Sequence, residues 1–449
     1  MRENYQAVAE HVLDLARRAG ADDAEVMLVS GTEFSVTVRR GAVEKVMEAG
    51  SRTLGLRVFK NGRTSSTYSA DFTPAAMKRF VERAIELAAV AEPDSCAALP
   101  EWEERAAPSD LGLFDPAVTR LSTEEKIARA TRCEQSAFAL DPRITNSDGA
   151  TFGTDVNTVM LLNSRGFSGA YESTVASINI EVMADDADGK KRNDHWFSVD
   201  RSLDRLESPE DVGRRAAERA LRKIGARKVA TKEVPIVFDP LAAAGLLRTL
   251  TGAVSGSSLD RRATFLLGGE NTAVASELLS VTDDALMPGR LGSRPFDDEG
   301  VASRRNAIFD RGVFRGFLFD TYTAKKTGHL STGSCRRSVG GPPGVGTSNF
   351  YLQPGGSTPE EILATVEDGF YVTDMMGFGV NLTTGDFSRG AGGLWIENGR
   401  LSYPVTEVTI SGKLQQMLQD LEMTGSDIEW RGGVAAPTIK VRSMMVGGL

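Results

Sequence analysis

Hydrophobic and polar positions follow two different periods along the first part of the chain, which predicts helices packed on a sheet. Apolar residues recur at helical spacing over residues 3–19 and 74–91. Between these segments, over residues 24–68, apolar and polar positions alternate as they do in strands. Asn61-Gly62 interrupts the alternation with a strong signal for a two-residue hairpin. We therefore expect residues 1–92 to form an α+β unit, with two helices on an antiparallel sheet.

A second unit of the same kind is predicted for residues 122–228, after a proline-containing linker over residues 93–121. Ser122 and Glu125 have the spacing of a capping box, which predicts that a helix begins there and runs to about Leu140. Alternating strand patterns follow it and a helical pattern closes the unit. The middle of the chain is therefore expected to be another two-layer unit.

The remaining residues, 229–449, are expected to form a β-rich, barrel-like domain. A strand pattern over 232–238 precedes an apolar helix from about residue 240 to 251, and many short strand patterns follow. Glycine is frequent over 333–347 and 385–393, and it permits the bends of a curved sheet. These glycines could also admit a second backbone, such as a bound peptide, and the sequence leaves both interpretations open. The fold class is α+β throughout.

Net charge and cysteine content indicate which partners and which cellular compartment the protein has. The net charge of −9 over 449 residues argues against nucleic acid as a partner, because phosphate binding needs a basic face. The three cysteines are unclustered and imply no disulfide framework, which favours a reducing compartment. The first residues lack the apolar run of a signal peptide, and no segment approaches a membrane span. We expect a cytoplasmic protein without membrane contact.

Recognisable catalytic motifs are absent from the sequence. It contains no phosphate-binding loop, no dinucleotide fingerprint and no nucleophile elbow. Its three histidines exclude a histidine-rich metal centre, and His329 with Cys335 would supply only two zinc ligands. A free-standing hydrolase would need a site that the sequence does not reveal.

An acidic loop over residues 293–303 is the most distinctive stretch of the chain. Asp297, Asp298 and Glu299 are adjacent, so they repel one another unless N–H groups or cations compensate. Four arginines flank them, at positions 290, 294, 304 and 305. We interpret the loop as a hydrogen-bonded brace for the hairpin predicted around residues 310–312, without a catalytic role. A solvated connection and direct contact with a substrate are the alternatives.

Three motifs resemble the C-terminal domain of the TldD/PmbA family, also called modulators of DNA gyrase. They are Phe296-Asp-Asp-Glu-Gly300, Gly312-Val-Phe-Arg-Gly316 and Trp395-Ile-Glu-Asn-Gly399, and the similarity extends from residues 50–58 to residues 438–441. The resemblance implies a two-subunit zinc metalloprotease that cleaves unfolded peptides, in peptide maturation and antitoxin degradation. It also implies that the peptide is held as an added strand on a sheet edge.

One departure from the family pattern decides which subunit the chain resembles. In the zinc-bearing subunit, a His-Glu-x-x-x-His helix follows the first strand of the C-terminal domain. Here Arg248, Thr249 and Ala253 occupy those positions, and none of them can bind zinc or act as the base. The chain therefore resembles the PmbA (TldE) subunit, which has no catalytic or metal-binding residue of its own. Zinc is expected in a TldD-like paralogue that acts as partner.

The sequence also predicts that the chain assembles with another subunit. Val313–Phe319 is apolar, so we expect part of it to be buried against another subunit. The isolated chain should be a homodimer, the default for a single kind of chain, and the working form a heterodimer. The competing interpretation is a non-catalytic homodimeric interaction protein without a protease partner.

Overall fold

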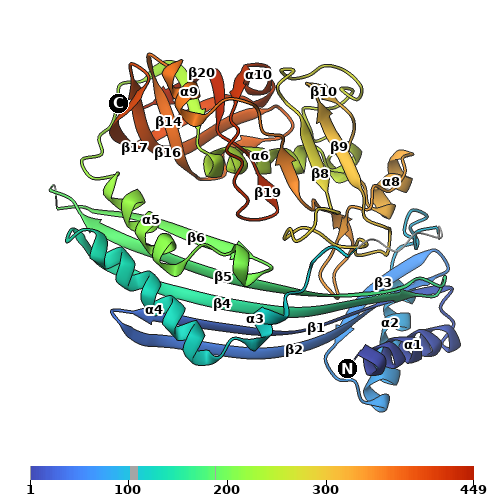
Figure 1. Ribbon diagram of the computed structural model, residues 1–449. Coiled ribbons are helices and arrows are strands. Elements are labelled where there is room, and N and C mark those ends of the chain that lie inside the picture. Colours follow the sequence, from blue (N-terminus) through green and yellow to red (C-terminus); the bar gives the residue numbers. More distant parts are fainter. Residues whose placement is uncertain (1, 102–109, 188, 449) are drawn as a thin grey trace.

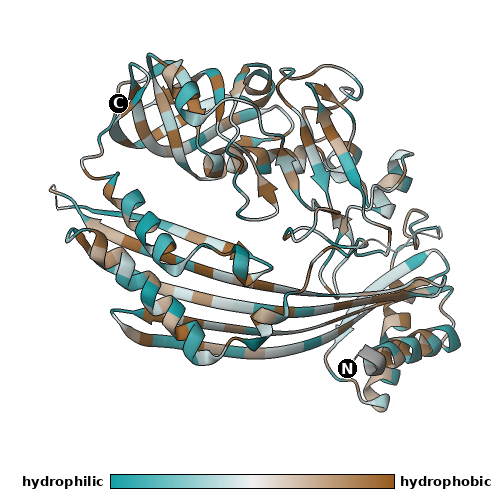
Figure 2. Cartoon of the chain, in the orientation of Figure 1, coloured by the Kyte–Doolittle hydropathy of each residue, from teal (hydrophilic) through white to brown (hydrophobic). Residues whose placement is uncertain are grey.

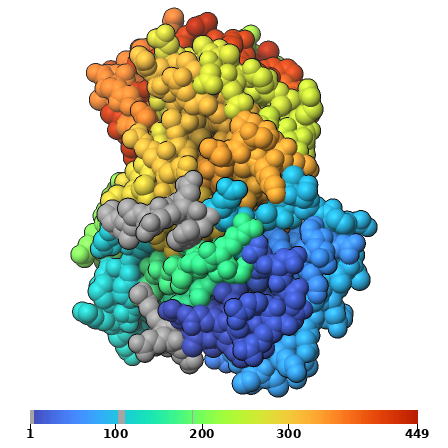
Figure 3. Space-filling view, turned by 90° about the vertical axis from the view of Figure 1, so that its right-hand side faces the viewer, coloured from blue at the N-terminus to red at the C-terminus, as the bar shows by residue number. Residues whose placement is uncertain are grey.

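The computed structural model describes residues 2–101, 110–187 and 189–448. The N-terminal half forms one long, curved sheet with helices, and the β-rich C-terminal half lies above it (Figure 1). In the space-filling view the two halves form two lobes, blue to green below and yellow to red above (Figure 3). Within the described ranges, no helix is both long and apolar enough to cross a membrane.

The N-terminal sheet has six antiparallel strands in the order β3-β2-β1-β4-β5-β6. The strands are β1 (Asp23–Arg39), β2 (Ala42–Lys60), β3 (Arg63–Ser69), β4 (Ile144–Asn163), β5 (Ser168–Asp185) and β6 (Lys191–Asp200). β1 pairs with β4 along most of its length, so the two predicted α+β units share a single sheet. The sequence pattern gave no sign of this join, because it reports the faces of a strand and not its neighbours.

All four long helices of this half cover the same face of the sheet. They are α1 (Arg2–Arg18), α2 (Pro74–Val90), α4 (Thr123–Leu140) and α5 (Pro209–Leu221). Val26 of β1 packs in the core under α1 and α2, whereas Val36 of the same strand packs under α4 and α5. Both have even numbers, so both side chains lie on one face. Helices α1, α4 and α5 mix hydrophilic and hydrophobic residues, as helices on a sheet surface do (Figure 2).

Local signals in the sequence set several element boundaries. Ser122 and Glu125 form the predicted capping box at the start of α4. Asn61 and Gly62 have φ values of 52° and 69°, the left-handed values that a two-residue hairpin turn requires. Both predictions are confirmed.

Five strands of the C-terminal half close into a barrel. They are β7 (Lys232–Phe238), β14 (Asp368–Met376), β16 (Asp386–Glu397), β17 (Arg400–Lys413) and β20 (Ile439–Gly447). Pairing runs β14-β7-β20-β17-β16, and β14 also pairs with β16, which closes the ring. The predicted α+β fold, with antiparallel sheet and helices followed by a barrel-like domain, is confirmed.

A second sheet, in the order β10-β9-β8-β13-β19, lies beside the barrel. Its strands are β8 (Val281–Asp284), β9 (Arg305–Asp310), β10 (Val313–Phe314), β13 (Phe350–Leu352) and β19 (Val434–Ala435). The other short strands are β11 (Cys335–Arg336), β12 (Gly344–Val345), β15 (Val380–Asn381) and β18 (Leu421–Thr424). The remaining helices are α3 (Pro116–Arg120), η1 (Leu203–Arg205), α6 (Pro240–Ala253), α7 (Gly256–Asp260), α8 (Thr321–Thr327), α9 (Pro359–Ala364) and α10 (Leu414–Gln419).

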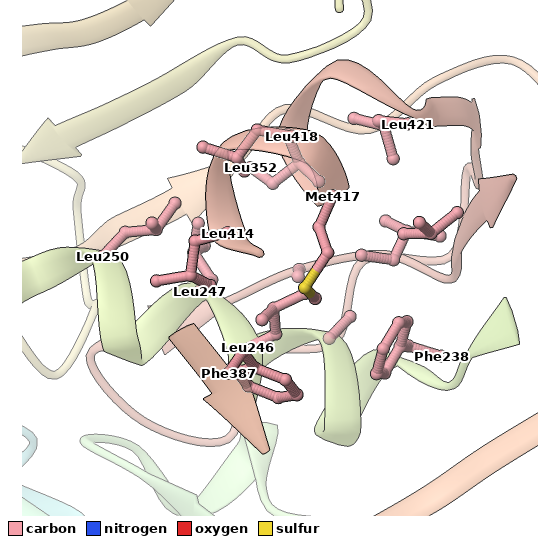
Figure 4. Packing of buried hydrophobic residues seen from close by; sticks show 14 of the residues in the cluster. Phe238, Leu246, Leu247, Leu250, Leu352, Phe387, Leu414, Met417, Leu418 and Leu421 are labelled. Carbon is pink, nitrogen blue, oxygen red and sulfur yellow. The ribbon is translucent and has the colours of Figure 1, made fainter. Parts of the chain in front are cut away.

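The C-terminal core corrects one prediction. Leu246 and Leu250 of α6 pack with Met417 of α10 in this core (Figure 4). The segment Val313–Phe319, expected to meet a partner, contributes Phe314, Phe317, Leu318 and Phe319 to the same core. The inference from this segment to a partner surface was wrong, because its apolar side chains are already buried within the chain.

At two glycines of the C-terminal half, another backbone segment of the same chain approaches closely. A Cβ at Gly393 would lie 1.9 Å from the carbonyl oxygen of Tyr371, where β16 meets β14. A Cβ at Gly333 would lie 2.7 Å from the carbonyl oxygen of Ala302. The close approaches found at these two glycines therefore belong to the fold itself.

Candidate functional site

Helix α6 carries Arg248, Thr249 and Ala253, the three positions that the sequence analysis assigned to a lost metal-binding motif. Arg248 is exposed, Thr249 is half-buried, and Ala253 is fully buried in the C-terminal core. The Thr249 hydroxyl donates a 2.6 Å hydrogen bond to the carbonyl oxygen of Leu246 on its own helix. Among the residues that the structure describes, no group of three or more His, Cys, Asp or Glu side chains could hold a metal ion.

Asp239 begins this helix and is itself buried. Its side chain accepts a 2.7 Å hydrogen bond from the backbone N–H of Ala242, the usual arrangement of a helix cap. Burial raises the pKa of Asp239 to about 6, although Arg219 lies 3.8 Å away and favours the charged form. Helix α6 is thus anchored at its start by a titratable cap.

The histidines do not form a site. His11, His195 and His329 are all exposed, and the ring of His329 stacks on Phe319 at 4.6 Å between centroids. Cys335 is buried beside the acidic loop, and burial raises the pKa of its thiol. Its low reactivity as a thiol follows, since the thiolate is the reactive form.

The acidic loop lies in the interior, where the two halves of the chain meet. Asp297 has no exposed surface, and its carboxylate accepts backbone N–H groups of Glu299 at 3.0 Å, Val301 at 2.9 Å and Cys335 at 3.0 Å. Burial, and then the charge of Glu299, raises the pKa of Asp297 to about 7. Gly300 has a φ of 80°, which lets the loop turn back to place these donors.

The other two acids of the loop bind different parts of the chain. Asp298 accepts the backbone N–H of Arg337 at 2.9 Å. Glu299 accepts a 3.1 Å hydrogen bond from Nη1 of Arg57 on β2. It also accepts a 2.9 Å hydrogen bond from the backbone N–H of Thr321, at the start of α8. Glu299 therefore connects the N-terminal sheet to the C-terminal half.

Glu25 completes this arrangement from the neighbouring strand β1. It stands directly opposite Arg57 in the sheet, and one of its carboxylate oxygens lies 2.6 Å from Nη2 of Arg337. Burial raises the pKa of Glu25, so the environment of this ion pair disfavours the charged form of the Glu25 carboxylate. We call the buried set the junction cluster; its members are Glu25, Arg57, Asp297, Asp298, Glu299 and Arg337.

Sequence reasoning missed half of this cluster. Of the flanking arginines, Arg294 approaches Asp298, at 3.6 Å, whereas Arg290 lies over the ring of Trp430 and Arg305 lies 4.0 Å from Asp284. Glu25 and Arg57, which interrupt strongly apolar strand segments, were the signals that could have been used. A charged residue on a buried strand needs a partner, but the sequence does not say where that partner lies.

Comparison with known proteins places the chain in a family of metallopeptidases. Sequence models of three PmbA/TldA metallopeptidase domains match in order: domain 1 over residues 24–88, the central domain over 116–224 and the C-terminal domain over 231–448. The chain belongs to the PmbA/TldD metallopeptidase family. The predicted resemblance is confirmed.

Relatives match over nearly their whole length. The chain is 35% identical to the metalloprotease PmbA of Escherichia coli O157:H7, covering 100% of this chain and 97% of that protein. A PmbA homologue of Haemophilus influenzae is 34% identical, with 100% and 96% covered. A solved structure from Bacteroides thetaiotaomicron, named as a candidate modulator of DNA gyrase, has a TM-score of 0.93 at 29% identity and covers 100% of both chains. TldE of Thermococcus kodakarensis shares the fold, with a TM-score of 0.89 at 24% identity, covering 98% and 100%.

Proposed function

We propose that this chain is the metal-free, PmbA/TldE-type subunit of a cytoplasmic zinc metalloprotease that cleaves unfolded peptides. A TldD-like paralogue would supply the zinc and the catalytic base. The observation that carries the proposal is helix α6, on which Arg248, Thr249 and Ala253 offer no metal ligand. The chain alone is then inactive, and zinc is not its cofactor.

The relatives support a paired arrangement. Haemophilus influenzae has a PmbA homologue and also a TldD homologue, to which this chain is 23% identical over 98% of its length. Two full-length versions of one architecture thus occur in a single organism. Such a pair suits a division of labour in which one chain holds the metal and the other completes the assembly.

A free sheet edge supports assembly through β2. Strand β3 pairs only with residues 54–60 of β2, so within the described residues the outer edge of residues 42–53 has no partner strand. Val43 and Val46 on this stretch are 46% and 50% exposed. An unpaired strand edge is a template for another strand, whether from a subunit or from an unfolded peptide.

The same edge favours the second candidate function. Two copies of the chain could pair through their β2 edges with two-fold symmetry, giving a homodimeric interaction protein without protease activity. The two functions differ in what a TldD-like partner does to the chain.

Mixing the purified chain with the TldD-like paralogue of its own genome tests the proposal. We expect casein cleavage only in the mixture, with zinc in the paralogue, and a heterodimer by light scattering. Val46→Lys should weaken assembly, because a charge on an edge strand opposes pairing, whereas Val90→Lys on the exposed surface of α2 is the matched control. Chelator-sensitive cleavage by the chain alone, with about one bound zinc, would contradict the proposal; a homodimer that ignores the paralogue would favour the second function.

A further inference from the structure

An apolar cavity lies in the C-terminal core, between the buried face of α6 and helix α10. Leu246, Leu247 and Leu250 line it from α6, and Met417 and Leu418 line it from α10. Figure 4 shows the side chain of Met417 directed toward Leu246. The strands β13, β18 and β20 contribute further lining residues. Two helices and strands of both C-terminal sheets thus surround one internal space.

The wall of this cavity carries no polar side chain. Within the described part of the chain, every residue that lines the cavity is Ala, Leu, Ile, Val or Met. The volume of the cavity is about 30 Å³. A water molecule needs about 10–15 Å³ and two to four polar partners, so the cavity offers the room for water but not the partners. An apolar cavity of this kind stays dry.

Several side chains of the wall keep uncovered surface although they belong to the core. Leu246, Leu418 and Ile439 are 6%, 7% and 6% exposed, whereas Leu414 on the same wall is fully covered. An atom that faces a void lacks dispersion contacts on that side. A guest of suitable size would restore these contacts without having to displace bound water.

Two residues of the wall set the size of the guest. Ala243 is the smallest side chain that lines the cavity, so the space beside it is space that a larger residue on α6 would fill. Met417 has a flexible side chain with a polarisable thioether, and such a side chain adjusts to irregular spaces. The cavity can therefore adapt its shape to a guest without movement of the backbone.

We propose that this cavity is a binding site for a small apolar molecule, such as a noble gas atom or a short hydrocarbon. The ligand has no hydrogen-bonding group, because the wall has no polar side chain to pair with it. It is smaller than an aromatic ring, because about 30 Å³ is far below the roughly 150 Å³ of a cavity that accepts benzene. The ligand contacts only the buried face of α6, so the site does not depend on the protease assignment.

Xenon tests this site on the full chain, by xenon NMR and by thermal unfolding at increasing xenon pressure. We expect saturable binding and a melting temperature that rises with pressure, because a ligand of the folded state stabilises it. Ala243→Val should weaken xenon binding by about tenfold or more, since the added methyl groups occupy the cavity. Ala244→Val is the matched control, because Ala244 is the next residue of α6 and is buried outside the cavity wall. This control should bind xenon like the parent.

Two variants on other elements complete the test. Val441→Ile adds one methyl group to the wall from β20 and should weaken xenon binding by about two- to tenfold. Leu418→Ala enlarges the cavity and should bind benzene at least about tenfold more tightly than the parent does. Absence of saturable xenon binding, or equal xenon affinity in the parent, Ala243→Val and Val441→Ile, would overturn the proposal. If Ala243→Val does not fold, Val441→Ile decides.

Discussion

Helix α6 and the junction cluster are the two regions in which the sequence places candidate chemistry, and they differ in what they do for the fold. On α6, Arg248 is exposed, and no ion pair is recorded for it in the described ranges. In the junction cluster, Asp297 and Glu299 have no exposed surface and accept hydrogen bonds from separate parts of the chain. Position 248 is therefore free to change, whereas the acidic loop is tied to the structure.

This contrast offers a physical reason for a bracing role of the acidic loop. The hydrogen bonds described above lead from the acids to the N-terminal sheet and to residues 321, 335 and 337, however, and not to the hairpin around residues 310–312 that the loop was expected to brace. We expect a loop whose carboxylates bind backbone N–H groups and a distant strand to stabilise the fold with or without a metal nearby. Arg248, by contrast, has no such duty, so a metal ligand there could be gained or lost without harm to the fold. The following predictions test this difference, beginning with the largest expected effect.

The double variant Asp297→Ala, Asp298→Ala should be the most damaging change. It removes the acceptors of four backbone N–H groups, three on Asp297 and one on Asp298. We expect a loss of unfolding free energy on the order of 5 kcal/mol, measured by urea and thermal unfolding. Asp310→Ala, on the exposed hairpin, is the control and should melt near the parent. If the double variant melts like the parent but its assembled complex stops cleaving peptide, the acids act on substrate and the brace interpretation is wrong.

Arg57→Met should cost less, about 3 kcal/mol, because it leaves the buried Glu299 without its partner on the sheet. Adding Glu299→Gln to this variant should recover part of the loss, since the uncompensated charge is then gone. Chemical denaturation of the two single variants and the double variant measures the coupling. A coupling near zero would show that this ion pair does not join the two halves.

The Asp239 cap should make stability depend on pH. Its folded pKa of about 6 lies above the ordinary value of 3.8, so the folded state binds its proton more tightly than the unfolded state. The resulting stabilisation is complete below about pH 4 and is lost as the pH rises through about 6, with a size on the order of 3 kcal/mol. Asp239→Asn keeps a good cap without titrating. The difference in stability between parent and variant should therefore change over this window, and a constant difference would contradict the raised pKa.

Arg248→Ala should have the smallest effect, within about 0.5 kcal/mol of the parent by thermal unfolding. Neither the parent nor this variant should retain stoichiometric zinc in metal analysis. A large loss of stability would mean that α6 needs Arg248, and the contrast between the two regions would fail.

Local structure was accessible from the sequence because its causes are local. Ser122, Asn61-Gly62 and the strand Lys232–Phe238 were placed by caps, turn residues and alternation that involve only near neighbours. The absence of metal ligands on α6 was equally readable, since it depends on residue types alone.

Long-range contacts were not accessible in the same way. Glu299 meets Arg57 across 242 positions, and nothing in either segment names the other. The apolar character of Phe314 and Phe317 shows that they are buried but not against which surface, so a core segment was taken for an interface. The acids Asp297, Asp298 and Glu299 could be identified from the sequence, whereas their distant partners could be identified only from the folded structure.

The pairing of β1 with β4 has a consequence for synthesis on the ribosome. β1 ends at Arg39, and β4 begins at Ile144, roughly 100 residues later. At about 5–20 residues per second, the nascent chain waits several seconds or more with one long edge of β1 uncovered. During that interval the first 90 or so residues can form their hairpins and helices but cannot complete their sheet. Slow codons or truncation before residue 144 would prolong this state, and chaperone binding to the open edge would be most valuable then.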